Sequence, residues 1–263
     1  MNPESGSQLV MSDEISKLPD SLLQHILSFL PTKEAIATSL VSKMWKPLWR
    51  SLSTLDLDDS IFGSSQHFVQ FVDAVLMFGD FRTIKKFHLL CRSYSIPPKQ
   101  IKIWAYAALK LKVEQLELIF PFCCYSLPSS VFVCSTIKEL KLEGLMVDPL
   151  SRVNLPSLKI MHLQGVQFHG FKCVAMLLSG CPLLESLSLS LVGMDMHASV
   201  LAAVGIASLK HLSSAAFPPF MMTLKAFSNV KFLSLCQDVW SPSQDIPMYF
   251  NLTRLEFGCF AED

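Results

Sequence analysis

Charge is scarce in this sequence of 263 residues: only 17% are Asp, Glu, Lys or Arg, and 22 basic residues balance 22 acidic ones. A neutral chain lacks the basic excess that nucleic-acid binding requires, which argues against DNA or RNA as a partner. Glycine is also scarce, with ten residues, and no G-x-G-x-x-G, G-x-x-x-x-G-K-[ST] or G-x-S-x-G pattern occurs. The sequence therefore offers no loop built to cradle phosphates and no nucleophile elbow.

Long apolar runs are missing as well. One of the most apolar stretches, Val174 to Leu178, is far shorter than the roughly 18 residues of a membrane-spanning helix. Residues 1–13 are small and polar, with no apolar segment of a secretory signal, and we expect them to form a disordered tail. The sequence predicts a soluble protein of the nucleus, the cytoplasm or both, with no membrane partner.

The eight cysteines include no C-x-x-C pair, and Cys123 and Cys124 are adjacent, which is poor spacing for zinc. We expect reduced thiols that fill the core. The series His162, His169, Cys173 has too few ligands for a metal site. No group of side chains suggests catalysis, so we expect no cofactor, no metal and no enzymatic activity.

Apolar residues, by contrast, make up 51% of the chain, and near the N-terminus they follow helical spacing. Asp20 or Ser21 is expected to cap this first helix, and Pro31 to end it. Thr32 is expected to cap a second helix, and a third carries Trp45, Leu48 and Trp49. The apolar positions of the first helix are Leu22, Leu23, Ile26, Leu27 and Leu30.

Three short helices cannot bury all of these side chains between themselves. A contiguous apolar patch is expected to remain, and such a patch on a soluble protein usually marks an interface. Periodicity alone leaves two alternatives: the patch binds another protein, or it packs on the rest of the chain. The expected patch consists of Leu18, Leu22, Ile26, Leu30 and Trp45.

The same residues resemble an F-box of the plant F-box/leucine-rich-repeat type. The resemblance rests on Leu18-Pro19, Leu22-Leu23, Ile26-Leu27, Phe29-Leu30-Pro31-Thr32-Lys33 and Val41-Ser42-Lys43-x-Trp45-x-x-Leu48-Trp49. It implies docking to a Skp-type adaptor and, through it, to cullin and RING subunits of a ubiquitin ligase. Leu48 and Trp49 are expected to pack toward the following domain. The resemblance implies that the adaptor is contacted by Leu18, Pro19, Leu22, Leu23, Ile26, Leu27, Leu30, Pro31, Val41 and Trp45.

Beyond residue 80 the spacing L-x-x-L-x-L recurs, with starts 21 to 29 residues apart, as in leucine-rich repeats. Apolar residues one position apart lie on the same side of a strand, and stacked parallel strands share one core. A weaker copy is expected at Leu209-Leu212. The clear copies are Ile84-Phe87-Leu89, Val113-Leu116-Leu118, Ile137-Leu140-Leu142, Leu158-Met161-Leu163, Leu184-Leu187-Leu189, Val230-Leu233-Leu235 and Leu252-Leu255-Phe257.

The alternating strand positions are expected on the concave face, where a target protein would bind. For any single residue the alternative is an ordinary solvated strand position. Helices are expected on the convex side at Gln100 to Lys110 and Phe171 to Ser179. The target-binding candidates are Lys86, His88, Glu117, Glu139, Lys141, Glu143, His162, Gln164, Ser188, Arg254 and Glu256.

Two features depart from a regular array. The ninth repeat position, usually Asn, holds residues such as Arg92 and Pro121, so the asparagine ladder is absent. The chain also stops soon after Phe257, where members of the resembled FBD-associated family continue, so we expect a copy shortened at its C-terminus with an open last strand.

The sequence thus predicts an α/β protein with a three-helix F-box followed by an irregular leucine-rich-repeat solenoid. The expected boundaries are an F-box at 14–53, a linking segment at 54–83 and the array at 84–263. By its resemblance, the chain is expected to be the substrate-recognition subunit of a Skp–cullin–F-box ligase, with an unknown target protein. The alternative is a non-degradative or degenerate F-box protein that binds the adaptor without presenting a target.

Overall fold

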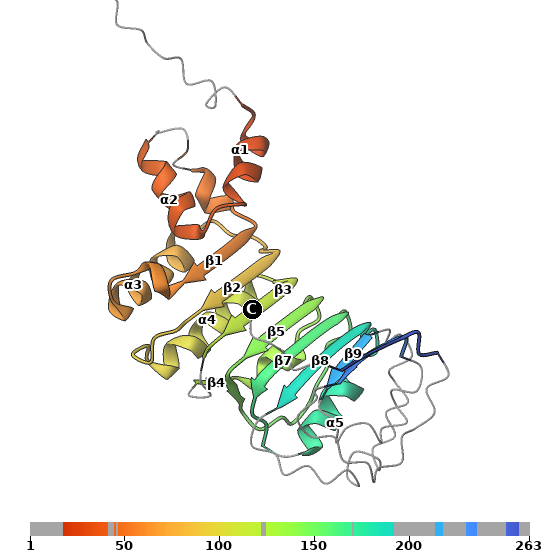
Figure 1. Ribbon diagram of the computed structural model, residues 1–263. Helices are drawn as coiled ribbons and strands as arrows, with labels where there is room; N and C mark the ends of the chain where they lie inside the picture. Colours follow the sequence, from red (N-terminus) through yellow and green to blue (C-terminus); the bar gives the residue numbers. More distant parts are fainter. Residues whose placement is uncertain are drawn as a thin grey trace, which may run out of the picture.

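The chain forms a small helical module at one end of a long parallel sheet (Figure 1). The computed structural model describes residues 18–41, 45, 47–121, 125–169, 171–191, 214–217, 230–235 and 251–257. The elements confirm the expected architecture, in which an F-box-like module precedes a repeat solenoid.

The N-terminal module consists of α1 (Asp20–Leu27), α2 (Thr32–Val41) and a short 3-10 turn, η2 (Leu48–Ser51). The expected third helix is reduced to that turn, and Trp45 lies before it. The expected side-chain cap of α1 is also wrong, because its cap position is Pro19, whose carbonyl accepts the N–H groups of Leu22 and Leu23. A shared core holds the module together: Leu23, Leu27, Ala35, Leu48, Trp49 and Leu52.

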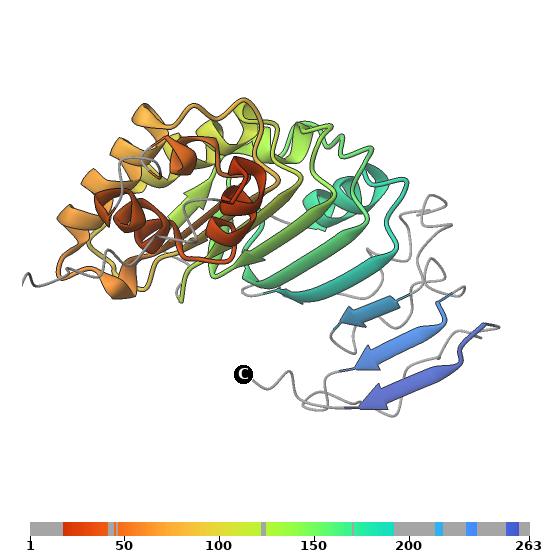
Figure 2. The ribbon, with the colours of Figure 1, turned by 90° about the horizontal axis from the view of Figure 1, so that it is seen from above.

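In the described part of the chain, nine strands form one sheet in which every pairing is parallel, and the strands follow chain order (Figure 2). The first four strands of the sheet alternate buried and half-exposed positions, so one face packs inward and the other is open. The strands are β1 (Thr54–Asp58), β2 (Lys86–Leu90), β3 (Gln115–Ile119), β5 (Glu139–Glu143), β7 (Ile160–Val166), β8 (Ser186–Leu191), β9 (Ser214–Phe217), β10 (Phe232–Leu235) and β11 (Arg254–Phe257).

The segment 54–83 is not a linker, contrary to expectation. It supplies the strand β1 and the helix α3 (Ser65–Phe78). In the pairing of β1 with β2, Leu55 lies beside Phe87 and Leu57 beside Leu89. Leu52, Leu55 and Leu57 have the same L-x-x-L-x-L spacing as the later copies, and all three are buried. The array therefore begins one repeat earlier than predicted.

The weak copy expected at Leu209-Leu212 is placed differently in the structure. There β9 pairs Ala215 with Leu187 of β8 and with Leu233 of β10. The repeat frame therefore lies three residues further along the chain, and its central apolar position is an alanine. Residues 209–213 lie outside the described part of the chain.

Helices line the side of the sheet opposite its open face (Figures 1 and 2). The helices α4 (Pro98–Lys110) and α5 (Phe171–Ser179) confirm the two expected convex helices. Trp104 of α4 is fully buried and donates its indole N–H to Asp73 of α3, with the two atoms 2.8 Å apart. In the described ranges the convex side also holds the turns η3 (Asp59–Ile61) and η4 (Ser129–Val133) and the paired short strands β4 (Tyr125–Leu127) and β6 (Leu145–Val147).

The helical module packs directly on the first strand of the sheet. Thr32 was expected to cap α2, but its side chain is only 1% exposed and its hydroxyl accepts the backbone N–H of Asp56 in β1, at 2.8 Å. Beside it, Lys33 donates to the carbonyl of Ile61 at 2.6 Å. Ile36 packs against both the module core and the sheet core. The side chains of α2 thus cover the edge of β1.

A buried carboxylate joins the first two repeats. Asp59, 7% exposed, accepts the backbone N–H groups of Arg92 and Ser93, each at 2.8 Å, in the loop after β2. Arg92 occupies the position where a regular repeat has asparagine. The backbone of this turn is therefore held by a side chain from the preceding repeat.

The thiols of Cys91, Cys173 and Cys181 are buried and free, and Cys134 is free and half-buried. Burial raises the pKa of Cys181 to about 12, as expected for a core-filling thiol rather than a reactive one. The other four cysteines lie outside the described residues. None of the helices in the described ranges has the length and apolar character that crossing a bilayer needs.

Candidate adaptor-docking face and target-binding face

One side of α1 exposes apolar side chains to solvent. Leu22 is 49% exposed, Ile26 40% and Phe29 74%, and Leu18 just before the helix is 36% exposed. Positions 22 and 26 lie one above the other on α1, and Phe29 lies in the turn that follows the helix. We call Leu18, Leu22, Ile26 and Phe29 the docking face. Phe29, the most exposed of the four, was not among the expected contacts, although its helical spacing from Leu22 and Ile26 could have identified it.

Leu23 and Leu27 need correction as expected adaptor contacts. Both are fully buried in the module core, so they face away from any partner and hold α1 on η2. Leu48 and Trp49, expected to pack toward the repeats, belong to this same core. Phe81 bridges it to the sheet core.

The other expected adaptor contacts differ in their exposure to solvent. Pro19 is exposed, whereas Leu30, Pro31 and Trp45 are half-buried. Val41 ends α2, and its side chain is outside the described part of the chain. Contact of these residues with an adaptor stays a prediction.

The register aligns the target-binding candidates in rows across the open face. Asp56, His88, Glu117, Lys141 and His162 lie side by side on successive strands. Gln164 and Ser188 also lie on this face, on β7 and β8. The structure therefore brings the candidates of β2 to β8 together on one surface.

At the N-terminal end of this face, several charged side chains pair with one another. The His88 ring contacts the Asp56 carboxylate through Nδ1 at 2.6 Å, and this hydrogen bond holds the pKa of Asp56 below its usual value. Lys86 pairs with Glu117 at 2.7 Å. These four paired side chains therefore offer little free charge to a partner.

The middle of the face offers groups that are less paired. Burial lowers the pKa of His162, although the nearby Glu139 carboxylate acts in the opposite direction. Glu139 accepts a hydrogen bond from Gln115 at 3.0 Å. Glu143, at the end of β5, is half-buried.

The candidates of the last strands are less completely described. Arg254 is exposed on β11, with its guanidinium 5.4 Å from the ring centroid of Phe232. Glu256 lies on the same strand, in register with Ser234, and its side chain is outside the described part of the chain.

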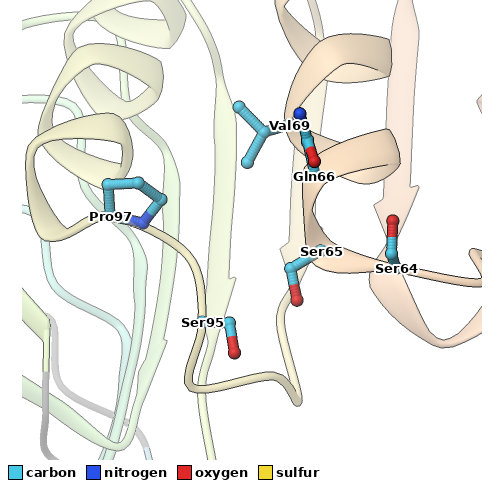
Figure 3. Close-up of a pocket in the computed structure, with 6 residues that line it drawn as sticks. All are labelled: Ser64, Ser65, Gln66, Val69, Ser95 and Pro97. Atoms are coloured by element: carbon cyan, nitrogen blue, oxygen red, sulfur yellow. The ribbon is translucent and has the colours of Figure 1, made fainter.

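A cavity of about 490 Å³ opens between the start of α3 and the loop that leads to α4 (Figure 3). Its lining is uncharged, so it offers hydroxyls for hydrogen bonds without an ionic anchor. None of the predicted target-binding residues lines it. The lining residues are Ser64, Ser65, Gln66, Val69, Ser95 and Pro97.

Comparison with known families agrees with this architecture. Residues 15–57 match the F-box domain, and residues 101–217 match the leucine-rich repeats of the FBD-associated F-box protein At5g56370. The first match ends within β1, and the second ends at the last residue of β9. The chain belongs to the F-box/leucine-rich-repeat family, with repeats of the FBD-associated type.

Its relatives in Arabidopsis thaliana include the F-box/LRR-repeat protein At3g59200, 39% identical over 71% of this chain and 38% of the relative. The F-box/FBD/LRR-repeat protein At4g26340 is 38% identical over 76% of this chain and 49% of the relative. The chain thus spans between about two fifths and half the length of these relatives. Proteins of the family are generally substrate adaptors of Skp–cullin–F-box ligases and typically not enzymes.

Proposed function

We propose that this chain docks a Skp-type adaptor through the docking face of α1 and holds a target protein on the open face of its sheet. Cullin and RING subunits join through the adaptor. The exposed apolar side chains of Leu22, Ile26 and Phe29 carry the proposal, because exposed apolar side chains gathered on one part of a soluble protein favour a protein interface.

The chain's contribution to ubiquitin transfer is proximity. A target held on the sheet gains a high effective concentration near the charged conjugating enzyme, and no catalytic group of this chain is needed. The negative open face described below repels phosphates, which supports a protein target over a nucleic acid. We place this activity in the nucleus or the cytoplasm, which imaging of a fluorescent fusion tests.

Adaptor capture tests the docking step. Replacing Leu22 and Ile26 together with Ala removes two central anchors, so capture should weaken by about 10-fold or more. Leu183→Ala is the matched control, because Leu183 is 43% exposed but lies beside the sheet, just before β8. Equal capture by the double variant and the control would overturn the docking assignment.

Reconstituted ubiquitylation separates the substrate receptor from the non-degradative alternative. With adaptor, cullin and RING subunits present, a target that co-purifies with the chain should be modified, and the Leu22/Ile26 double variant should abolish that modification. A chain that captures the adaptor but supports no modification of its bound partners would favour the alternative.

A further inference from the structure

Two apolar side chains point outward on the open face. At the corresponding positions, the strands on either side carry charged side chains. Leu90 ends β2 and Ile119 ends β3, both are half-buried, and the sheet register pairs them directly. Both strands alternate so that Phe87, Leu89 and their counterparts face the core while Leu90 and Ile119 do not.

A carboxylate lies on each side of this apolar pair. The register places Asp58 of β1 beside Leu90 and Glu143 of β5 beside Ile119. Four adjacent strands therefore present one row that reads acid, apolar, apolar, acid. We call Asp58, Leu90, Ile119 and Glu143 the acid-flanked row. The Asp58 carboxylate also accepts the N–H of Ser60 at 2.8 Å, which fixes its position.

The surroundings of the row are negative. On the open face of β1 to β8, five carboxylates stand against two lysines, which leaves three negative charges when histidines are counted as neutral. One lysine, Lys86, is already paired with Glu117. The other, Lys141, lies between Glu139 and Glu143 on β5, and the exposed Arg92 follows β2 in a loop. Because the whole chain is neutral, this face is a local excess of negative charge.

We propose that the acid-flanked row is a subsite for an extended segment of the target protein, in which one apolar residue lies between two basic residues, each two positions away. This proposal rests on the proposed function. The apolar side chain of the target would contact Leu90 and Ile119. Its two basic side chains would contact Asp58 and Glu143. A segment with acidic ends would face like charges, which costs binding energy and excludes it.

The dimensions of the row fit such a segment. Neighbouring strands lie about 4.8 Å apart, so the row from Asp58 to Glu143 spans about 14 Å. An extended chain advances about 3.3 Å per residue, so its positions i and i+4 lie about 13 Å apart. Side chains at i, i+2 and i+4 share one face of an extended segment, so all three can contact the row.

Peptide binding tests the subsite. The full chain, co-purified with a Skp-type adaptor, is titrated against the fluorescein-labelled peptide Gly-Lys-Ser-Leu-Ser-Lys-Gly, and fluorescence anisotropy is recorded. Asp58→Asn and Glu143→Gln should each weaken binding by about 3- to 10-fold, and the two together by more. Ile119→Thr keeps a β-branched side chain in the strand and should weaken binding by about 5-fold or more. Raising the salt concentration should weaken binding to the unmodified chain more than to the double variant.

One control removes a carboxylate outside the row, and the others change the charge or the apolar side chain of the peptide. Glu185→Gln removes a carboxylate before the start of β8 and should leave binding unchanged. Peptides with Glu in place of Lys, or Ser in place of Leu, should bind at least about 10-fold more weakly. Equal binding of the Lys and Glu peptides, or unchanged binding by the Asp58/Glu143 double variant, overturns the subsite. Absence of peptide binding by a chain that retains its adaptor overturns the subsite alone, whereas failure to retain the adaptor counts against the proposed function.

Discussion

The two outer strands of the sheet differ in how their apolar side chains are covered. Leu55 of β1 and Leu255 of β11 occupy the same position of the repeat, because the register connects them through every intervening strand. Leu55 is fully buried, whereas Leu255 is 45% exposed. Beside β1 lie Thr32 and Ile36 of the F-box module, so one strand edge is protected by a domain that is not a repeat. The F-box module therefore has a structural role besides the docking role that we propose for it.

The largest expected difference is in the cost of truncating these two leucines. Leu55→Ala should lower the free energy of unfolding by about 2–5 kcal/mol, because it leaves a cavity in the core. Leu255→Ala should cost less than about 1 kcal/mol, because that side chain is already half in water. Urea denaturation followed by circular dichroism measures both. Equal costs would show that the two strands are equally covered in solution.

Thr32→Val tests the cover of β1 itself. The substitution keeps the shape of the side chain but removes the acceptor for the Asp56 N–H, so it should cost about 1–3 kcal/mol. Hydrogen exchange at the Asp56 amide should also accelerate. Thr32→Ser retains the hydroxyl and should retain most of the protection. If the valine and serine variants exchange alike, the hydroxyl does not protect this strand.

Lys33→Met tests the second contact of α2 with the first repeat. The lysine ammonium lies 2.6 Å from the carbonyl of Ile61 and 4.3 Å from the centre of the Phe62 ring. Methionine preserves the apolar stem, so the loss should be limited to about 0.5–1 kcal/mol for the exposed cation. Lys33→Arg, which keeps the charge, should recover part of it. Thermal unfolding of the unmodified chain and the two variants provides the comparison. Identical unfolding midpoints would show that Lys33 does not stabilise the contact between α2 and the first repeat.

The smallest expected effect concerns pH. The hydrogen bond from His88 lowers the pKa of Asp56, so this carboxyl contributes stability above its unfolded pKa of about 3.9, and the contribution is lost as the pH falls through the folded value. The difference in unfolding free energy between the unmodified chain and Asp56→Asn should therefore shrink below about pH 4. Because the Asp56 side chain is 38% exposed, solvent screening keeps the effect small. A difference that grows on acidification would contradict this sign.

The repeat spacing predicted most of the sheet, because an L-x-x-L-x-L pattern requires each strand to bury two positions against its neighbours. It failed at two strands for different reasons. β1 was missed although Leu52, Leu55 and Leu57 follow the pattern, because residues 54–83 were assigned to a segment that links the F-box to the array. At β9 the pattern itself fails, since Ala215 stands where the other strands carry larger side chains. Spacing alone cannot recover such a strand, whose position is fixed by pairing with β8 and β10.

The expected apolar patch already contained Leu18, Leu22 and Ile26, which are exposed. The adaptor contacts implied by the resemblance also included Leu23 and Leu27, which fit the same apolar helix but face inward. The inward side is decided by contacts distant in sequence, because Leu48, Trp49 and Leu52 pack against Leu23 and Leu27. Similarly, the sequence placed Thr32 at the helix start but could not show that its hydroxyl is used by a strand 24 residues later.

Asp59 has a consequence for how the repeats can diverge. Its carboxylate binds the backbone N–H groups of residues 92 and 93, and backbone groups are the same whatever side chain is present, proline excepted. Substitutions at position 92 therefore leave these hydrogen bonds intact, so the side chain at that position is not needed to hold the turn. A repeat held in this way does not need the usual asparagine at this position, and a search for that asparagine would overlook it.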